Sequence, residues 1–278
     1  MKIGVNYLTE LVDLIQQEKV GIDFIKYPSV SSTKVTELMN ITKQVDNKLL
    51  FHNTISKNGD ILTMGDDFFI EQLDIEQTRL ALQLSKNPYM SIHISDKNTE
   101  SENKGKTEEE LLCIIEKNAK FLEETFPEIK VFSIENREYA TIYDRTDFLT
   151  KVFKRTGFKF LLDISHVKGA ADKQNIDFYE YLKALPLEYV YETHLNGWKY
   201  SPEGKDLSHG KINDECYEAL KYVLDHSNLE IITIEYGAIE INKKMVSLNN
   251  EDENMPQVYE DILEQVSKIQ KIIEEKRK

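Results

Sequence analysis

KFLLDISH, from Lys159 to His166, is an apolar run that turns polar at its C-terminal end. The pattern is typical of a parallel strand buried on both faces, whose apolar side chains need no polar partner. Asp163 does need one, because a buried carboxylate is costly unless it is paired or bound. Asp163 and His166 are three residues apart and can meet only if the chain bends after Ile164. Together they suit a divalent metal; the alternative is an Asp that caps the next helix beside a solvated His.

Length and composition favour a folded α/β enzyme. The chain has 278 residues, and a closed α/β barrel typically needs about 250. The N-terminus lacks the apolar core of a signal peptide, and no apolar run is long enough to span a membrane, so we expect a cytoplasmic protein without membrane contact. The formal net charge of −14 argues against a nucleic-acid partner. Cys113 and Cys216 form no Cys-x-x-Cys, so we expect two buried, passive thiols.

Eight strand-like segments alternate with eight helical patterns. The strands are expected at Lys2 to Tyr7, Ile22 to Tyr27, Leu49 to Asn53, Tyr89 to Ser95, Lys130 to Glu135, Lys159 to Ile164, Tyr189 to Leu195 and Glu230 to Tyr236. The helices are expected at Thr9 to Glu18, Ser32 to Asp46, Phe69 to Ser85, Thr107 to Phe126, Arg145 to Thr156, Asp177 to Leu185, Asn213 to His226 and Pro256 to Glu275. This alternation predicts an α/β fold, a (β/α)8 TIM barrel in a single domain over residues 1–278. A doubly wound open sheet is the alternative, but no Gly-x-Gly-x-x-Gly follows a strand.

Long loops are expected after several strands. Segments 53–67 and 197–213 would stand over the C-terminal face of the barrel, where the active site of this fold forms. We expect a substrate to rest on the second segment, near Trp198 and Tyr200. Segment 238–255 is interpreted as a lid or a surface excursion.

Ligand-type side chains lie at or near the C-terminal ends of the third to eighth predicted strands. They are His52, His93, Glu135, Asp163, His194 and Glu235. Since side chains alternate along a strand, the same parity points all six toward the barrel axis. Three carboxylates in one low-dielectric space would repel one another, and cations resolve that conflict. Six ligands exceed what one tetrahedral ion uses, so the sequence predicts two or more ions bridged by a carboxylate.

Each of these residues also has a structural interpretation when it is taken singly. A His at a strand end often anchors a loop, and a Glu can pair with Lys26 or Lys168. The equivalent positions of the whole set favour the metal. Glu192 shares a face with His194 and is expected to orient it.

A further site is a hypothesis for three loop residues. His166, His209 and Asp206 either complete that site or are solvated. His226 ends a predicted helix, where a cation complements the helix dipole, and we expect it to be structural.

The chain resembles the xylose-isomerase-like TIM-barrel superfamily, and within it the multinuclear non-haem iron-dependent oxidative enzymes. The motifs that carry the resemblance span nearly the whole chain: Gly4-Val-Asn-Tyr7, Val20-Gly-Ile-Asp-Phe24, His52 with its trailing loop, His93-Ile-Ser95, Glu135-Asn136 with Tyr139, Leu161-Leu-Asp163 and Glu192-Thr-His-Leu195. Endonuclease IV is similar over Asp163-Ile-Ser-His166, Thr193-His-Leu-Asn196 and His209-Gly-Lys-Ile212.

The resemblance implies a set of two or three metal ions. Its trinuclear arrangement would place one ion on His52, His93 and a bridging Glu135. A second ion would take Glu135, Asp163, His194 and Glu235, and a third would take His166, His209 and Asp206. Iron is the metal that the resemblance favours, and zinc or manganese also suits these ligands.

Three functions remain open on the sequence. The first is an oxidative iron enzyme that acts on a cysteine-containing peptide with dioxygen. The second is a redox-free isomerase, epimerase or phosphoester hydrolase that uses zinc, manganese or magnesium on a small polar substrate. The third is a metal-binding or partner-binding protein without turnover. The metal and its open coordination positions would separate them.

Overall fold

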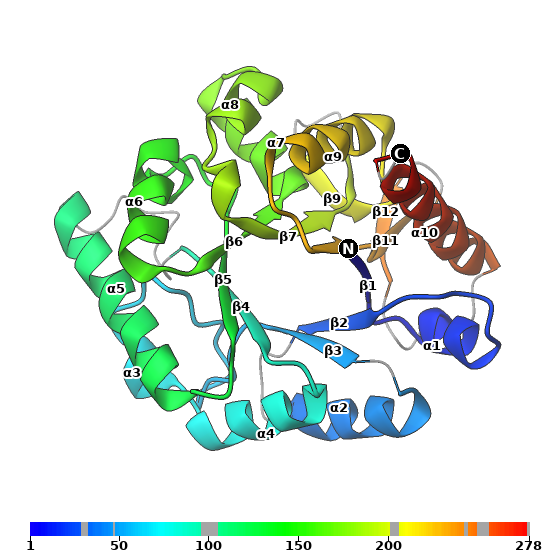
Figure 1. Ribbon diagram of the computed structural model, residues 1–278, viewed down its shortest axis with the longest axis horizontal. Coiled ribbons are helices and arrows are strands. Elements are labelled where there is room, and N and C mark those ends of the chain that lie inside the picture. Colours follow the sequence, from blue (N-terminus) through cyan, green and yellow to red (C-terminus); the bar gives the residue numbers. More distant parts are fainter. Residues whose placement is uncertain are drawn as a thin grey trace.

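Eight parallel strands close into a barrel with helices around it (Figure 1). The computed structural model describes residues 1–28, 33–46, 48–95, 105–200, 206–241, 244–248 and 256–276. The barrel strands are β1 (Lys2–Asn6), β2 (Phe24–Pro28), β3 (Lys48–His52), β4 (Tyr89–His93), β5 (Val131–Glu135), β6 (Lys159–Asp163), β7 (Val190–Leu195) and β10 (Ile231–Ile234). Each overlaps a predicted strand, and β10 closes the ring by pairing with β1. The predicted (β/α)8 barrel is confirmed.

The helices form the outer layer (Figure 1). They are α1 (Thr9–Gln16), α2 (Thr33–Gln44), α3 (Phe69–Gln72), α4 (Ile75–Ser85), α5 (Glu108–Thr125), α6 (Thr146–Thr156), α7 (Ile164–Gln174), α8 (Phe178–Ala184), α9 (Asp214–His226) and α10 (Pro256–Lys276), with short 3-10 turns at Ile142–Asp144 and Leu187–Tyr189. Helix α5 begins at a capping box, in which Thr107 and Glu110 satisfy each other's backbone N–H groups. The buried apolar faces of these helices pack on the outside of the barrel wall.

Three expectations about the helices and thiols are wrong. The single helix predicted from Phe69 to Ser85 breaks into α3 and α4, because Asp74 adopts an extended backbone and accepts a hydrogen bond from the N–H of Gln77. Helix α7 was not expected, and it begins directly after β6 with no intervening loop. Cys113 is exposed, because it lies off the apolar stripe of α5, whereas Cys216 is buried as expected.

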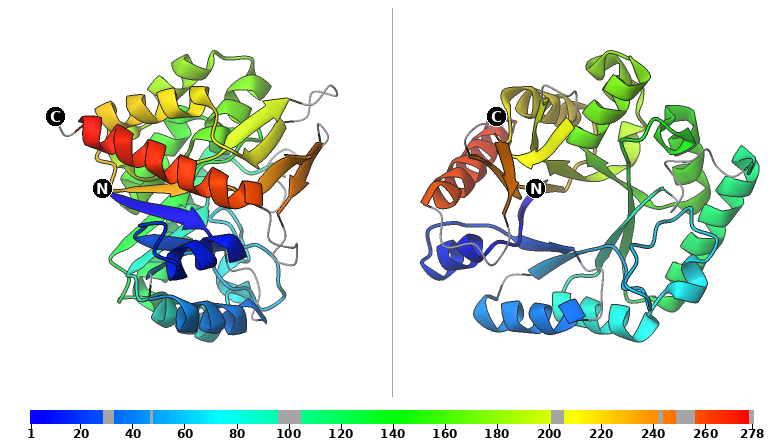
Figure 2. Two further views of the ribbon diagram at one scale, coloured as in Figure 1. Left: turned by 90° about the vertical axis from the view of Figure 1, so that its right-hand side faces the viewer. Right: turned by 180° about the vertical axis from the view of Figure 1, so that it is seen from behind.

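Two antiparallel hairpins stand where only loops were expected. One pairs β8 (Gly197–Tyr200) with β9 (Asp206–Gly210), and the other pairs β11 (Ala238–Ile241) with β12 (Lys244–Ser247). Both project from the face to which the barrel strands point, away from the N-terminus (Figure 2). Residues 242–243 and 249–255 of the expected lid or surface excursion lie outside the described residues, as do residues 96–104 before α5.

The first hairpin depends on a close backbone approach at Gly197. A Cβ added there would lie 1.8 Å from the carbonyl oxygen of Lys211, whereas one added at Gly21 would meet nothing within 4 Å. We expect Gly197→Ala to lower the free energy of unfolding by about 1–3 kcal/mol or more, because backbone atoms cannot yield as a side chain can. Gly21→Ala is the matched control in urea unfolding. Equal effects of the two substitutions would show that the hairpin can shift to admit the methyl group.

An apolar floor closes the barrel interior below the polar residues. It is a separate cluster of Phe24, Leu50, Tyr89 and Ile231, which come from four strands. Leu50, Tyr89 and Ile231 precede His52, His93 and Glu235 by an even number of positions, so they share the face that carries these ligand-type side chains. The polar groups therefore lie above this apolar packing, at the end of the barrel from which the hairpins project.

Candidate metal centre

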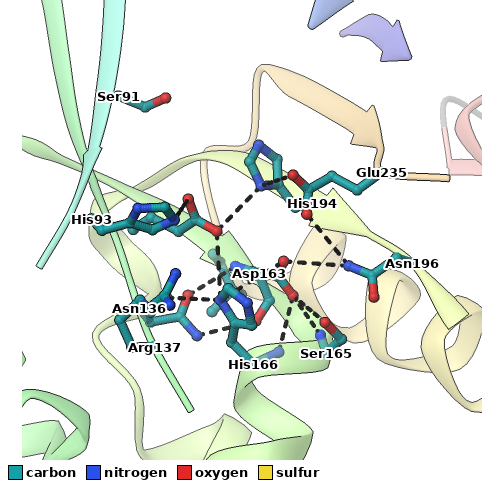
Figure 3. A network of polar contacts seen from close by, with 12 residues as sticks. Ser91, His93, Asn136, Arg137, Asp163, Ser165, His166, His194, Asn196 and Glu235 are labelled. Atoms are coloured by element: carbon teal, nitrogen blue, oxygen red, sulfur yellow. Dashed lines mark hydrogen bonds and ion pairs between the residues drawn. The ribbon is translucent and has the colours of Figure 1, made fainter. Parts of the chain in front are cut away.

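The six predicted ligands converge at the C-terminal end of the barrel, and Figure 3 shows four of them, His93, Asp163, His194 and Glu235, in one polar network. Strand register sets neighbouring pairs side by side, with His93 beside Glu135 and Asp163 beside His194. Glu135, Asp163 and His194 are at most 1% exposed. Two subsets bring one ligand atom of each residue within 4.8 Å of one another: His52, His93 and Glu135, and then Glu135, Asp163, His194 and Glu235. We call them the three-residue group and the four-residue group.

In the three-residue group, three ligand atoms form a near-equilateral triangle. The Nε2 atoms of His52 and His93 are 3.3 Å apart, and Glu135 Oε2 lies 3.0 Å from the first and 3.2 Å from the second. The other ring nitrogen of His52 is held 2.8 Å from the hydroxyl of Ser91. That contact fixes the imidazole so that Nε2 faces the group, as second partners do in metal sites.

The other oxygen of Glu135 belongs to the four-residue group. Glu135 Oε1 lies 3.4 Å from His194 Nδ1, and the same nitrogen is 3.4 Å from Glu235 Oε1. One carboxylate therefore presents an oxygen to each group, which is the arrangement of a bridge between two ions. Glu192 approaches the far nitrogen of His194 at 3.4 Å and accepts a hydrogen bond of 2.5 Å from Thr233, as expected of an orienting residue.

One carboxylate oxygen of Asp163 caps a helix, and the other faces the candidate metal centre. Oδ1 accepts hydrogen bonds from the backbone N–H groups of Ser165 and His166 and so caps α7, while Oδ2 lies 3.3 Å from the side-chain amide of Asn196. The turn of α7 supplies the predicted bend and brings His166 Nδ1 to 3.8 Å from Oδ2. The helix-cap interpretation and the site interpretation of Asp163 thus both hold, whereas the solvated His is wrong, since His166 is buried.

The residues of the expected third site lie beside these groups. His166 Nδ1 is 2.9 Å from the carbonyl oxygen of Asn136, which leaves Nε2 as its ligand atom. His209 adopts a left-handed backbone at φ 64°, and its Nδ1 lies 3.8 Å from Glu235 Oε2. Among the described side chains neither joins a candidate ion group. Asp206 begins β9, but its side chain lies outside the described part, so the third site stays a prediction.

Several residues of the site were not predicted from the sequence. Asn196 bridges Asp163 and Glu235 at 3.3 and 3.5 Å, and its oxygen accepts from the backbone N–H of His209. Arg137 follows the bridging Glu135 by two positions, lies 5.0 Å over the ring of Tyr139 and donates to its hydroxyl. Within the described residues its buried Nε has no hydrogen-bond partner.

Trp198 was expected to lie near a bound substrate, but its side chain is not accessible to one. It is buried, and its ring packs 6.0 Å from that of Phe178. The side chain of Tyr200 lies outside the described part.

Orphaned polar atoms test whether these residues fit a metal. Both ring nitrogens of His194 and Glu135 Oε2 are buried without a hydrogen bond in the described structure. Such atoms are costly in a protein interior unless something binds them. Three carboxylates and three imidazoles around them are ligands for iron, zinc or manganese, so the donor set fits divalent cations.

The imidazoles of the three-residue group are in the form that binds metals. Burial lowers the pKa of His93 to about 4, and it lowers the pKa of His52 well below its usual value. Burial opposes ionisation of Glu135, but the imidazoles of His93, His52 and His194 outweigh it and hold the pKa of Glu135 well below its usual range. At neutral pH the group therefore offers two neutral nitrogens and one carboxylate.

The lowered pKa of His93 predicts how the stability of the metal-free protein depends on pH. We expect the free energy of unfolding to fall as the pH drops from 6.5 to about 4, the ordinary and folded-state pKa values of His93. In that window the unfolded chain binds a proton that buried His93 does not, and stability rises with pH wherever the unfolded state binds more protons. Protonation linked to His93 should lower the free energy of unfolding by about 3 kcal/mol across this window. In urea unfolding across the window, His93→Gln should have the shallower slope; a slope equal to the wild type would mean that folded His93 protonates freely.

Comparisons with known proteins identify the relatives of the chain. Residues 2–274 match the family model described as RiPP precursor modification enzyme MbnB/TglH/ChrH. A UPF0276 protein of Caulobacter vibrioides is 42% identical over 60 residues, which are 22% of this chain and 20% of that protein's length. UPF0276 protein VP3015 of Vibrio parahaemolyticus is 24% identical over 225 residues, which are 76% of this chain and 73% of that protein.

Solved structures share the fold at low identity. A xylose isomerase-like TIM barrel protein from Mycobacterium smegmatis in complex with magnesium has a TM-score of 0.56 at 10% identity, over 99% of this chain and 97% of that one. Endonuclease IV from Thermus thermophilus has a TM-score of 0.53 at 15% identity, over 99% of this chain and 100% of that one. The expected resemblance to this superfamily is confirmed.

Within the described residues, every helix is too short or too polar to span a bilayer.

Proposed function

Because the chain belongs to the RiPP precursor modification enzyme family MbnB/TglH/ChrH, we propose that it is an iron-dependent oxidative enzyme that modifies a cysteine-containing peptide. The observation that carries the proposal is Glu135, whose two oxygens face two separate groups of buried ligands. Two or three ions would be held by the predicted set. The single barrel domain over residues 1–278 and the cytoplasmic location are part of the same proposal.

The proposed ligands are the residues that the sequence singled out. His52, His93 and Glu135 would hold one ion, and Glu135, Asp163, His194 and Glu235 would hold a second. His166 and His209 lie beside them, and with Asp206 they are proposed for a third. Bound iron supplies the one-electron and dioxygen chemistry that amino-acid side chains lack.

The chain's own residues do the positioning. Ser91 and Glu192 orient the imidazoles of His52 and His194, and Asn196 holds the carboxylates of Asp163 and Glu235 at one spacing. The apolar floor excludes water from below. These contacts fix the ligands before any ion or substrate arrives, which lowers the cost of ordering them.

Arg137 is the group that we assign to the substrate. It follows the bridging Glu135 by two positions, and Figure 3 draws it in the same network of polar side chains. Within the described structure its buried Nε–H has no hydrogen-bond partner, and such a donor suits a carbonyl or carboxylate of a peptide. A small polar substrate with a carboxylate would suit the same donor.

Oxygen consumption separates the proposal from its alternatives. Protein purified without oxygen and loaded with iron(II) should consume dioxygen when a cysteine-containing peptide encoded beside it is added, and the peptide should change in mass. The matched control is the same peptide with Ser in place of Cys. If no such peptide causes oxygen uptake, while manganese-loaded protein isomerises a sugar or zinc-loaded protein cleaves a phosphoester, a redox-free enzyme is the correct assignment.

A further inference from the structure

Lys26 places its amino group inside the candidate metal centre, where burial lowers its pKa and the carboxylates of Glu135, Glu192 and Asp163 favour the charged form. Among the lysines whose side chains the structure describes, it is the one that is buried. It lies on β2 two positions after Phe24 of the apolar floor, and β2 carries none of the predicted ligands. Its ammonium contacts Glu235 Oε1, and the two side chains are 4% and 7% exposed.

The contacted oxygen faces a nitrogen of the four-residue group. Glu235 Oε1 is also the atom 3.4 Å from His194 Nδ1. The second oxygen of Glu235 faces Asn196 and His209 instead. An ion that used this oxygen of Glu235 would therefore share it with an ammonium. Two cations on one buried oxygen repel each other with little screening by solvent or salt.

The three-residue group is placed differently. Its ligand atoms are Nε2 of His52, Nε2 of His93 and Glu135 Oε2, and none of them contacts Lys26. The charge of Lys26 reaches His52 and contributes to its lowered pKa, but through space rather than through a shared ligand atom. The penalty on an ion is therefore larger at the four-residue group.

We propose that Lys26 is a built-in cation that weakens ion binding at the four-residue group and so makes the three-residue group fill first. This inference rests on the proposed metal centre. In metal-free protein the same charge offsets part of the repulsion among the four buried carboxylates, which are Glu135, Asp163, Glu192 and Glu235. Lys26 thus stabilises the empty pocket and opposes its complete filling.

Titration of metal-free protein with Mn²⁺, followed by calorimetry, tests the proposal. Wild type should show a tighter and a weaker class of site. Lys26→Gln keeps a hydrogen-bond donor for Glu235 without the charge, and it should tighten the weaker class at least about tenfold while changing the tighter class by less than about threefold. Lys26→Arg keeps the charge and should bind as the wild type does. Lys221→Met removes an exposed lysine that pairs with Glu218, and it should change neither class.

Two further variants assign the effect to a group. The gain from Lys26→Gln should persist in a His93→Gln background, which damages the three-residue group, and disappear in a Glu235→Gln background. Thermal melting checks that each variant is folded, and Lys26→Met repeats the test if Lys26→Gln is not.

Contrary results separate the two claims. If Lys26→Gln weakens Mn²⁺ binding or leaves it unchanged, Lys26 instead positions Glu235 for the ion or has no effect on it, and the inference is wrong. If neither the wild type nor Lys26→Gln binds Mn²⁺, the proposed metal centre itself is wrong.

Discussion

Glu135→Ala is expected to abolish loading of both ion groups and to reduce oxidative activity by at least about 100-fold, since mutating even an outer partner of a metal ligand costs 10–100-fold. The reason is geometric: Oε2 of Glu135 lies beside His52 and His93, and Oε1 lies beside His194. Other buried ligands serve one group each. Removing Glu135 should therefore lower the number of bound ions more than removing His93 does, because His93 belongs to the three-residue group alone.

Metal analysis of purified protein checks this expectation. The matched control is His226→Ala, because His226 is an exposed histidine that caps its own helix by bonding the carbonyl of Tyr222. It should leave metal content unchanged. If Glu135→Ala and His226→Ala retained the same number of ions, Glu135 would not be the bridge.

Asp163 should separate metal binding from folding. Asp163→Asn retains an oxygen that can cap α7 but replaces Oδ2 by an amide that cannot bind a cation. We expect metal-free Asp163→Asn to unfold within about 1 kcal/mol of the wild type, because Asn is as good a helix cap as Asp. Asp163→Ala removes the cap and leaves buried N–H groups of Ser165 and His166 unbonded, which should cost about 2–4 kcal/mol.

Both variants should lose ion binding at the four-residue group. Urea unfolding and Mn²⁺ titration of the same preparations measure the two effects side by side. Unfolding of Asp163→Asn at the same urea concentration as Asp163→Ala would show that the charge itself holds the fold. Wild-type ion binding by Asp163→Asn would remove Asp163 from the ligand set.

The sequence predicted the barrel and the six converging ligands because both depend on local rules. Strand length and alternation fix which residues reach the axis, and parallel strands bring their C-terminal ends to one face. Asp163 was predicted from its cost inside an apolar run. Lys26 lies in a similar run, Phe24-Ile25-Lys26-Tyr27, and the expectation that a Glu can pair with it is confirmed by its contact with Glu235.

Other features of the site depend on contacts between distant residues, which a local sequence pattern does not predict. Asn196 and His209 are thirteen residues apart and meet because β8 and β9 pair, and that pairing depends on the absence of a side chain at Gly197. The break before α4 is different, since Asp74 and Gln77 form a recognisable cap within an otherwise continuous apolar period. In this case the sequence contains the helix cap at Asp74, but the apolar spacing continues across it and predicts a single helix.

The central claim is that one carboxylate joins two ion groups in this pocket. Anomalous scattering from crystals of iron-replete protein, recorded at the iron edge, tests it most directly. The expected result is at least two ions, both touching Glu135, with His52 and His93 on one and Asp163, His194 and Glu235 on the other. A single ion, no ion, or two ions of which only one touches Glu135 would contradict it.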